Sequence, residues 1–267
     1  MILASATATS VALSVATALA YSVPALGGSR IGPRPKAGLI VLAWLLHAAV
    51  LALGLFGDQA FFGFAPALSG TAWLVAAVYG LESYFYPGLQ TRWGLSALGA
   101  VAVLMAMVFP GAPLHTNASP WLAMHWALGI ASYGLFGAAA VHAWLMLRAE
   151  AHMRHGQDPH SGMPLLTIER LTFRFVAAGF VLLTATLVVG WLFTEALYGQ
   201  GVTWKWNHKT VFSLLSWVTF AVLLLGRWRF GWRGRPAVRM LYAGSVLLLL
   251  AYVGSRFVLE VVLGRTP

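Results

Sequence analysis

The sequence predicts an all-α polytopic membrane protein, a bundle of eight transmembrane helices forming a single membrane domain over residues 1–267. Two observations predict this class. The chain is 60% hydrophobic and only 9% charged, which is far more apolar than an ordinary soluble domain. Apolar runs long enough to cross a hydrocarbon core, which takes roughly 20 helical residues, recur along the whole chain. The runs are continuous rather than alternating, so they favour helices over strands.

The predicted spans are about 2–23, 37–56, 65–86, 93–109, 121–147, 171–198, 209–226 and 237–262. Helix-breaking residues support these ends: Pro24 with Gly27 closes the first span, Pro87 the third and Pro110 the fourth. The first span carries no basic residues before it, unlike a signal peptide, so we expect a retained helix with its N-terminus outside.

Lysine and arginine counts predict the orientation of the spans. One side of the membrane is predicted to carry Arg30, Arg34, Lys36, Arg92, Arg148, Arg154, Arg170, Arg174, Arg227, Arg229, Arg233, Arg235 and Arg239. The other side has only Lys205, Lys209 and Arg265, with Arg256 inside the last span. Both termini are therefore expected on the periplasmic side. The net charge of +10 then indicates anionic lipid headgroups as partners rather than nucleic acid.

The chain has no cysteine, so thiol and iron–sulfur chemistry are excluded and any metal chemistry must use histidine or a bound cofactor. The longest predicted loop, about 148–170, holds His152, His155 and His160. A surface loop explains these three histidines, and a loosely spaced metal site is the alternative.

Histidines at membrane depth are candidates for function, because ionisable side chains are costly in lipid. His47 falls near the middle of the second span, and His142 is expected to snorkel at the inner rim. His125 lies one turn below the outer surface and shares a helical face with Gly129 and Ser132. That face could seat a flat ring beneath the imidazole or serve plain helix packing.

The stretch TWKWNHKTVFSLLSW, residues 203–217, places His208 at the same depth as His125. Two histidines on separate helices could supply two axial imidazoles to one iron. Trp204, Trp206 and Trp217 could wall such a pocket, or they could form an interfacial aromatic belt.

Charged residues near the outer ends of the spans have two interpretations each. Arg256 and Glu260 are spaced for an ion pair, and Arg256 could instead reach an anionic group such as a porphyrin carboxylate. Glu195 is a candidate partner of Lys205 or Lys209.

Three motifs resemble the membrane haem-handling proteins of cytochrome c assembly, the CcsA, ResC and CcmC type. Trp204-Lys-Trp206-Asn207-His208-Lys209-Thr210 is similar to that family's tryptophan-rich pattern W-x-W-D-P-K-E-T. Gly231-Trp-Arg-Gly234 resembles its Gly-Trp-Arg-Gly, and His125 with Ser132 and Tyr133 resembles its H-x6-S-Y helix. The resemblance covers about 120–262 well and the first four spans only by topology.

The resemblance implies haem b held at the outer face beneath the tryptophan-rich segment, with histidine ligands. His125 matches the ligand histidine that precedes this segment, and Trp204 and Trp206 match its aromatic wall. His47 matches no motif, although larger members of the family also use histidines within the membrane, so His47 is a weaker candidate ligand.

The chain also departs from the family pattern. Asn207 stands where the aspartate should be, His208 replaces the proline, and no second outer histidine follows the last span. These features resemble the shorter YpjD-like and HemX-like branch, for which no enzymatic thioether formation is expected. His208 is then the candidate second ligand.

The sequence therefore predicts a haem-handling protein of the bacterial inner membrane that supports cytochrome c assembly and is not an enzyme. His125 and His208 would ligate iron, and Lys205, Lys209 or Arg256 would neutralise the haem propionates. Other cytochrome c assembly proteins are the expected partners. Two alternatives stay open: a HemX-like regulator or scaffold for a haem-biosynthesis enzyme, and a small-solute transporter with a path past His47 and Glu82.

Overall fold

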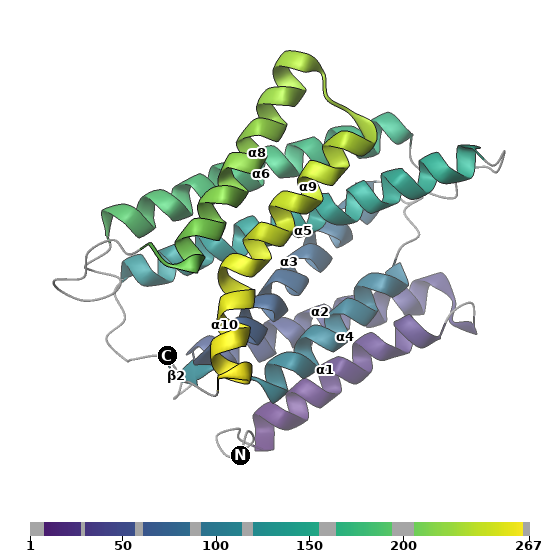
Figure 1. The fold of residues 1–267 in the computed structure, drawn as a ribbon. Helices are drawn as coiled ribbons and strands as arrows, with labels where there is room; N and C mark the ends of the chain where they lie inside the picture. The colour runs from purple at the N-terminus through teal and green to yellow at the C-terminus, as the bar shows by residue number, and fades with distance from the viewer. Residues whose placement is uncertain are drawn as a thin grey trace. The chain divides into compact units, whose positions relative to one another are not determined.

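The computed structural model (Figure 1) describes residues 8–27, 30–56, 61–85, 92–113, 120–154, 164–193 and 206–263. The described residues form eight long helices and one two-stranded antiparallel ladder, which confirms the all-α class. The elements are α1 (Ala8–Leu26), α2 (Pro33–Phe56), β1 (Phe61–Phe62), α3 (Phe64–Phe85), α4 (Arg92–Val108), β2 (Ala112–Pro113), α5 (Pro120–Arg154), α6 (Leu165–Leu192), α8 (His208–Phe230), α9 (Gly234–Leu249), η2 (Leu250–Gly254), α10 (Ser255–Phe257) and η3 (Val258–Val262).

Seven of the described helices are long and apolar enough to cross a membrane. The exception is α4, whose 17 residues extend about 25 Å at a rise of 1.5 Å per residue. Its crossing of the membrane, and the periplasmic placement of the termini, stay predictions. The 35 residues of α5 extend about 52 Å, well beyond a hydrocarbon core of about 30 Å.

The chain separates into two compact units, and whether they form a single membrane domain stays a prediction. Unit 1 contains α1 to α4 and the segment from Arg256 onward, and unit 2 contains α5, α6, α8, α9 and η2.

In unit 1, α1 packs against α4 and α2 through the buried Tyr21 ring. A Cβ at Gly99 of α4 would lie only 2.9 Å from that ring, so glycine permits the close packing. Trp44 of α2 and Trp73 of α3 stack at 4.7 Å, and each indole N–H donates to the other's backbone carbonyl. The strands β1 and β2 pair antiparallel.

In unit 2, α5 packs along α6, α8 packs along α9, and Phe136 and Phe220 stack at 3.8 Å in the core. Both rings are almost fully buried. Phe136 rests on Gly179 of α6 and Phe220 rests on Gly244 of α9, where added Cβ atoms would lie 3.1 and 2.9 Å from the rings. Aromatic rings set against glycines thus fix the spacing of these four helices.

Three details of the predicted helices differ from the structure. Much of the predicted loop 148–170 is helical, because α5 continues to Arg154 and α6 already begins at Leu165. His152 therefore lies on the last turn of α5, with its Nδ1 donating to the carbonyl of Arg148, whereas His155 and His160 lie outside the described residues. Pro24 lies inside α1 and does not end it. The last predicted span is not one α-helix, because π-helical turns at η2 and η3 interrupt it.

Candidate functional site

His125 of α5 is held by a backbone carbonyl of the neighbouring helix α6. Its Nδ1 lies 3.1 Å from the carbonyl oxygen of Thr186. Because a carbonyl oxygen only accepts, Nδ1 must carry the proton, and Nε2 of the neutral ring then keeps a lone pair. Within the part of the chain that the structure describes, Nε2 makes no hydrogen bond. The half-buried imidazole is thus oriented like a metal-binding histidine whose second nitrogen is available.

The His125 ring approaches α6 closely because residue 190 is glycine. A Cβ at Gly190 would lie 3.2 Å from Cε1 of the imidazole. Gly129 on α5 also faces α6, where its Cβ would lie 3.7 Å from Thr186, and the buried Ser132 donates to the carbonyl of Gly129. These contacts favour helix packing for the Gly129 and Ser132 face, and the seating of a flat ring there stays a prediction.

The start of α8 explains the departures from the tryptophan-rich pattern. Asn207 is the N-cap, and its side-chain Oδ1 accepts from the backbone N–H of Thr210 at 3.0 Å and from the Thr210 hydroxyl at 3.1 Å. Asparagine and aspartate cap helices about equally well. His208 is the first residue of α8, the position at which proline is favoured in other helices. Asn207 therefore preserves a capping role at the aspartate position, and the exposed His208 adds an imidazole.

Lys209 connects the start of α8 to both α5 and η2. Its ammonium lies 5.5 Å from the centre of the Tyr252 ring, and it also interacts electrostatically with His125. Tyr133 of α5 donates its hydroxyl to the carbonyl of Leu248, at the junction of α9 and η2. The π-helical turn and the H-x6-S-Y motif therefore meet at the same end of unit 2 as His125.

The predicted tryptophans occupy different environments. Trp206 is 72% exposed just before α8. Trp217 lies about 16 Å further along, at 1.5 Å per residue, where its indole N–H donates to the Thr184 hydroxyl and its ring stacks on Phe180. The described contacts of Trp217 are thus between α8 and α6, whereas Trp204 lies outside the described residues.

The remaining predicted residues are less fully placed. Lys205 and Glu195 lie outside the described residues. Arg256 lies in unit 1, and its part in binding an anionic group stays a prediction. The side chain of Glu260 is also outside the description, so its ion pair with Arg256 stays a prediction.

The two histidines nearer the middle of their helices are buried. His47 is fully buried in unit 1, with Nε2 at 2.8 Å from the Ser69 hydroxyl and Nδ1 at 3.3 Å from the Tyr21 hydroxyl. Both ring nitrogens are engaged, which favours a structural role over iron ligation. The prediction that His142 snorkels was wrong, because it is 2% exposed and its Nδ1 donates to the carbonyl of Ala138.

Sequence reasoning missed an ion pair at the opposite end of unit 2. Glu169 of α6, 8% exposed, pairs with Arg227 of α8 and lies 3.5 Å from Arg233. The signal for this ion pair is a single glutamate, Glu169, among arginines in the segment predicted to be a loop.

The Gly-Trp-Arg-Gly motif ends α8. Gly231 adopts φ 65° and caps the helix, so the chain turns back and the Trp232 ring lies over Gly226. The Gly-Trp-Arg-Gly motif is therefore a helix-ending turn that delivers Arg233 to a buried carboxylate.

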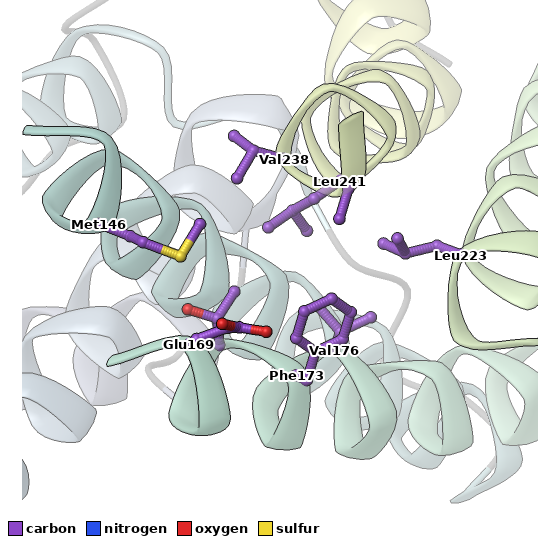
Figure 2. Close-up of a pocket in the computed structure, with 9 residues that line it drawn as sticks. Met146, Glu169, Phe173, Val176, Leu223, Val238 and Leu241 are labelled. Atoms are coloured by element: carbon purple, nitrogen blue, oxygen red, sulfur yellow. The ribbon is translucent and has the colours of Figure 1, made fainter. Parts of the chain in front are cut away.

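A narrow pocket lies beside Glu169 (Figure 2). Met146, Glu169, Thr172, Phe173, Val176, Leu223, Ala237, Val238 and Leu241 line it. It leaves room for about one water-sized molecule, so it is no site for a haem.

Comparison with known proteins decides the family. A family model described as cytochrome C assembly protein matches residues 35–263, most of the chain. The chain belongs to the cytochrome c assembly protein family. This membership confirms the resemblance predicted from the His125, tryptophan-rich and Gly-Trp-Arg-Gly motifs, and the match also covers α2, α3 and α4, whereas α1 lies before it.

Three relatives of this cytochrome c assembly protein differ in their sequence identity to the chain and in the share of each chain that the match covers. Inner membrane protein YpjD of Escherichia coli K12 is 33% identical over 150 residues, 55% of this chain and 56% of that protein. An uncharacterized 28.8 kDa protein from Azospirillum brasilense is 31% identical over 255 residues, 93% of this chain and 85% of that protein. Cytochrome c biogenesis protein CcsA of Prochlorococcus marinus is 22% identical over 183 residues, 66% of this chain and 54% of that protein. No solved structure matches.

The relatives and the helices together establish the location. A homologue is an inner membrane protein, and seven described helices can cross a membrane, so this family member is a multi-pass inner-membrane protein. The matches span only about half of the E. coli and Prochlorococcus proteins.

The donor set around His125 fits a haem. Haem iron takes neutral imidazole nitrogen, and Nε2 of His125 offers a lone pair in a ring already oriented by Thr186. Haem carboxylates need a cation nearby, and Lys209 lies at the same end of unit 2. The imidazole of His125 and the ammonium of Lys209 are thus described groups that could hold haem here, and the exposed His208 lies next to Lys209 in the sequence.

Proposed function

We propose that this chain is a haem-handling protein of the inner membrane that supports cytochrome c assembly. One observation carries the proposal: the 3.1 Å bond from Nδ1 of His125 to the Thr186 carbonyl leaves Nε2 as the nitrogen available to iron. Family membership supports haem b as the ligand class.

Each residue would act by binding or orienting. His125 would supply one axial imidazole, and the exposed His208, next in sequence to Lys209, would supply the second. Lys209, with Lys205, would neutralise propionates, and Trp204 and Trp206 would cover the ring. The bound haem would itself supply the redox-active iron.

The proposed role is to hold and present haem rather than to catalyse bond formation. Other cytochrome c assembly proteins would receive the haem or position the chain.

Visible absorption of the detergent-purified protein during haem titration tests the proposal. The wild type should give a low-spin spectrum, His208→Ala should convert it to a high-spin spectrum, and His125→Ala should lose it. His152→Ala is the matched control, because it removes a partly exposed helical histidine far along α5 from His125. An unchanged spectrum in His125→Ala would overturn the assignment of His125, and no binding by the wild type would overturn haem handling.

A second readout separates ligation from folding. Added imidazole should restore the low-spin spectrum of a folded His125→Gly variant, since a free ligand can occupy the vacated position. Failure of imidazole to restore it, in a protein with wild-type helix content by circular dichroism, would count against His125 as a ligand.

A further inference from the structure

One face of α8 is a continuous apolar stripe open to its surroundings. Its exposed residues recur at alternating spacings of four and three, which places them on one side of the helix. They are Val211, Leu215, Val218, Val222 and Leu225, each between 40% and 55% exposed. The stripe is about 21 Å long at 1.5 Å per residue, more than the roughly 15 Å depth of one leaflet of a 30 Å core.

Aromatic and basic residues continue this stripe at the last turn of α8. Trp228 and Arg229 follow Leu225 by three and four positions, so both stay on the same face. Trp228 is 83% exposed, and the neighbouring Phe230 is 70% exposed. Exposed tryptophan at the end of a membrane-crossing helix is typical of the headgroup level.

Arg227 and Arg229 differ in what their guanidinium groups contact. Arg227 turns inward, where it pairs with Glu169, donates to the Trp232 carbonyl at 3.1 Å and covers the Phe173 ring at 4.4 Å. Arg229 is exposed and has no ion pair or hydrogen bond within the residues that the structure describes. Arg229 is therefore the arginine on this turn with its hydrogen-bond donors available to an external anion.

The surrounding end of unit 2 is strongly basic. The described ends of α5, α6, α8 and α9 that meet there carry nine arginines against two glutamates. The arginines are Arg148, Arg154, Arg170, Arg174, Arg227, Arg229, Arg233, Arg235 and Arg239, and the glutamates are Glu150 and Glu169. Glu169 is occupied by Arg227, so little negative charge competes for Arg229.

We propose that Arg229, Trp228 and the α8 stripe form a binding site for an anionic phospholipid. The guanidinium would bind the headgroup phosphate through its paired N–H donors, Trp228 would lie at the glycerol level, and an acyl chain would run along Leu225 and Val222. Phospholipid is favoured over free phosphate or an acidic protein because its acyl chain matches the apolar stripe and its phosphate matches the cation, whereas free phosphate would leave the stripe uncovered. This site is separate from the proposed haem site at the other end of α8.

Native mass spectrometry of the full chain with added phosphatidylglycerol or phosphatidylcholine tests this site. The wild type should retain phosphatidylglycerol preferentially, and Arg229→Gln should weaken that retention about fivefold, the effect expected of one basic residue near an anionic surface. Arg154→Gln is the matched control, because it also removes an exposed arginine, at the end of the long helix α5, where Glu150 and Ala151 on the preceding turn of the same face are only partly exposed. It should change retention less than twofold.

Further variants decide between a specific site and general charge. Arg229→Lys should give an intermediate loss of phosphatidylglycerol retention, since lysine keeps the charge but not the paired N–H donors. This variant replaces Arg229→Gln in the test if Arg229→Gln does not fold. Val222→Asn should weaken retention of the lipid but not binding of inorganic phosphate. Equal losses in Arg229→Gln and Arg154→Gln, or displacement of the lipid by inorganic phosphate alone, would overturn the proposal.

Discussion

Gly190 on α6 faces the imidazole of His125 on α5 so closely that a Cβ at residue 190 would lie 3.2 Å from the ring carbon Cε1. This approach places the ring where its Nδ1 meets the carbonyl of Thr186, one helical turn earlier on the same helix. Helix spacing and histidine orientation are therefore coupled at this site, and the coupling can be tested by substitution.

Gly190→Ala is expected to weaken haem binding about three- to tenfold. The imidazole would have to leave its rotamer by a small angle, which costs about 0.5–1.5 kcal/mol. Haem titration followed by absorption measures the effect. Gly129→Ala is the control, because its Cβ would make an ordinary contact of 3.7 Å with Thr186. Equal affinities for the two variants would contradict the role of Gly190.

Asn207→Ala is expected to destabilise the start of α8 by about 0.5–2 kcal/mol, because the backbone N–H of Thr210 loses its acceptor. Thermal unfolding in detergent measures this loss. Asn207→Asp should match or exceed the wild type, since aspartate caps equally well and its charge favours a helix N-terminus. A destabilised Asn207→Asp variant would show that the residue does more than cap.

Glu169→Gln is expected to lower the free energy of unfolding by about 2–3 kcal/mol. The expectation is below the roughly 3–5 kcal/mol for a buried pair, because the side chain of Arg227 is 25% exposed. Chemical or thermal unfolding provides the measurement. Glu150→Gln breaks only the exposed 3.9 Å contact with Arg235 and should cost less than about 1 kcal/mol. If both substitutions lower the free energy of unfolding equally, the Glu169 ion pair stabilises this end of unit 2 no more than the exposed Glu150 contact does.

Gly244→Ala is expected to destabilise unit 2 by about 1–3 kcal/mol, because its Cβ would lie 2.9 Å from the buried Phe220 ring. Gly54→Ala provides the comparison, since nothing lies within 4 Å of its Cβ and alanine favours a helix by about 0.5–1 kcal/mol. The two variants should therefore shift the unfolding temperature in opposite directions. A Gly244→Ala variant as stable as the wild type would mean that α8 and α9 can separate without cost.

Much of the candidate site was accessible from sequence because its signals are local. His125 and the tryptophan-rich segment are short motifs, and the Asn207 cap needs only the residues that follow it. The partner of His125 was not accessible, since Thr186 is distant in sequence and contributes a backbone carbonyl that carries no sequence signal. The engagement of both His47 nitrogens depends likewise on Tyr21 and Ser69, which come from two other helices.

The sequence by itself determined the class, the location of seven membrane-crossing helices and the family, because hydropathy and short motifs are properties of contiguous residues. Only the tertiary structure decided that Glu169 meets Arg227, that His142 is buried and that the last span contains π-helical turns. Those features depend on which helices pack together and at what spacing. The spacing is set by aromatic rings lying on glycines, such as Phe220 on Gly244, in contacts between residues far apart in the chain.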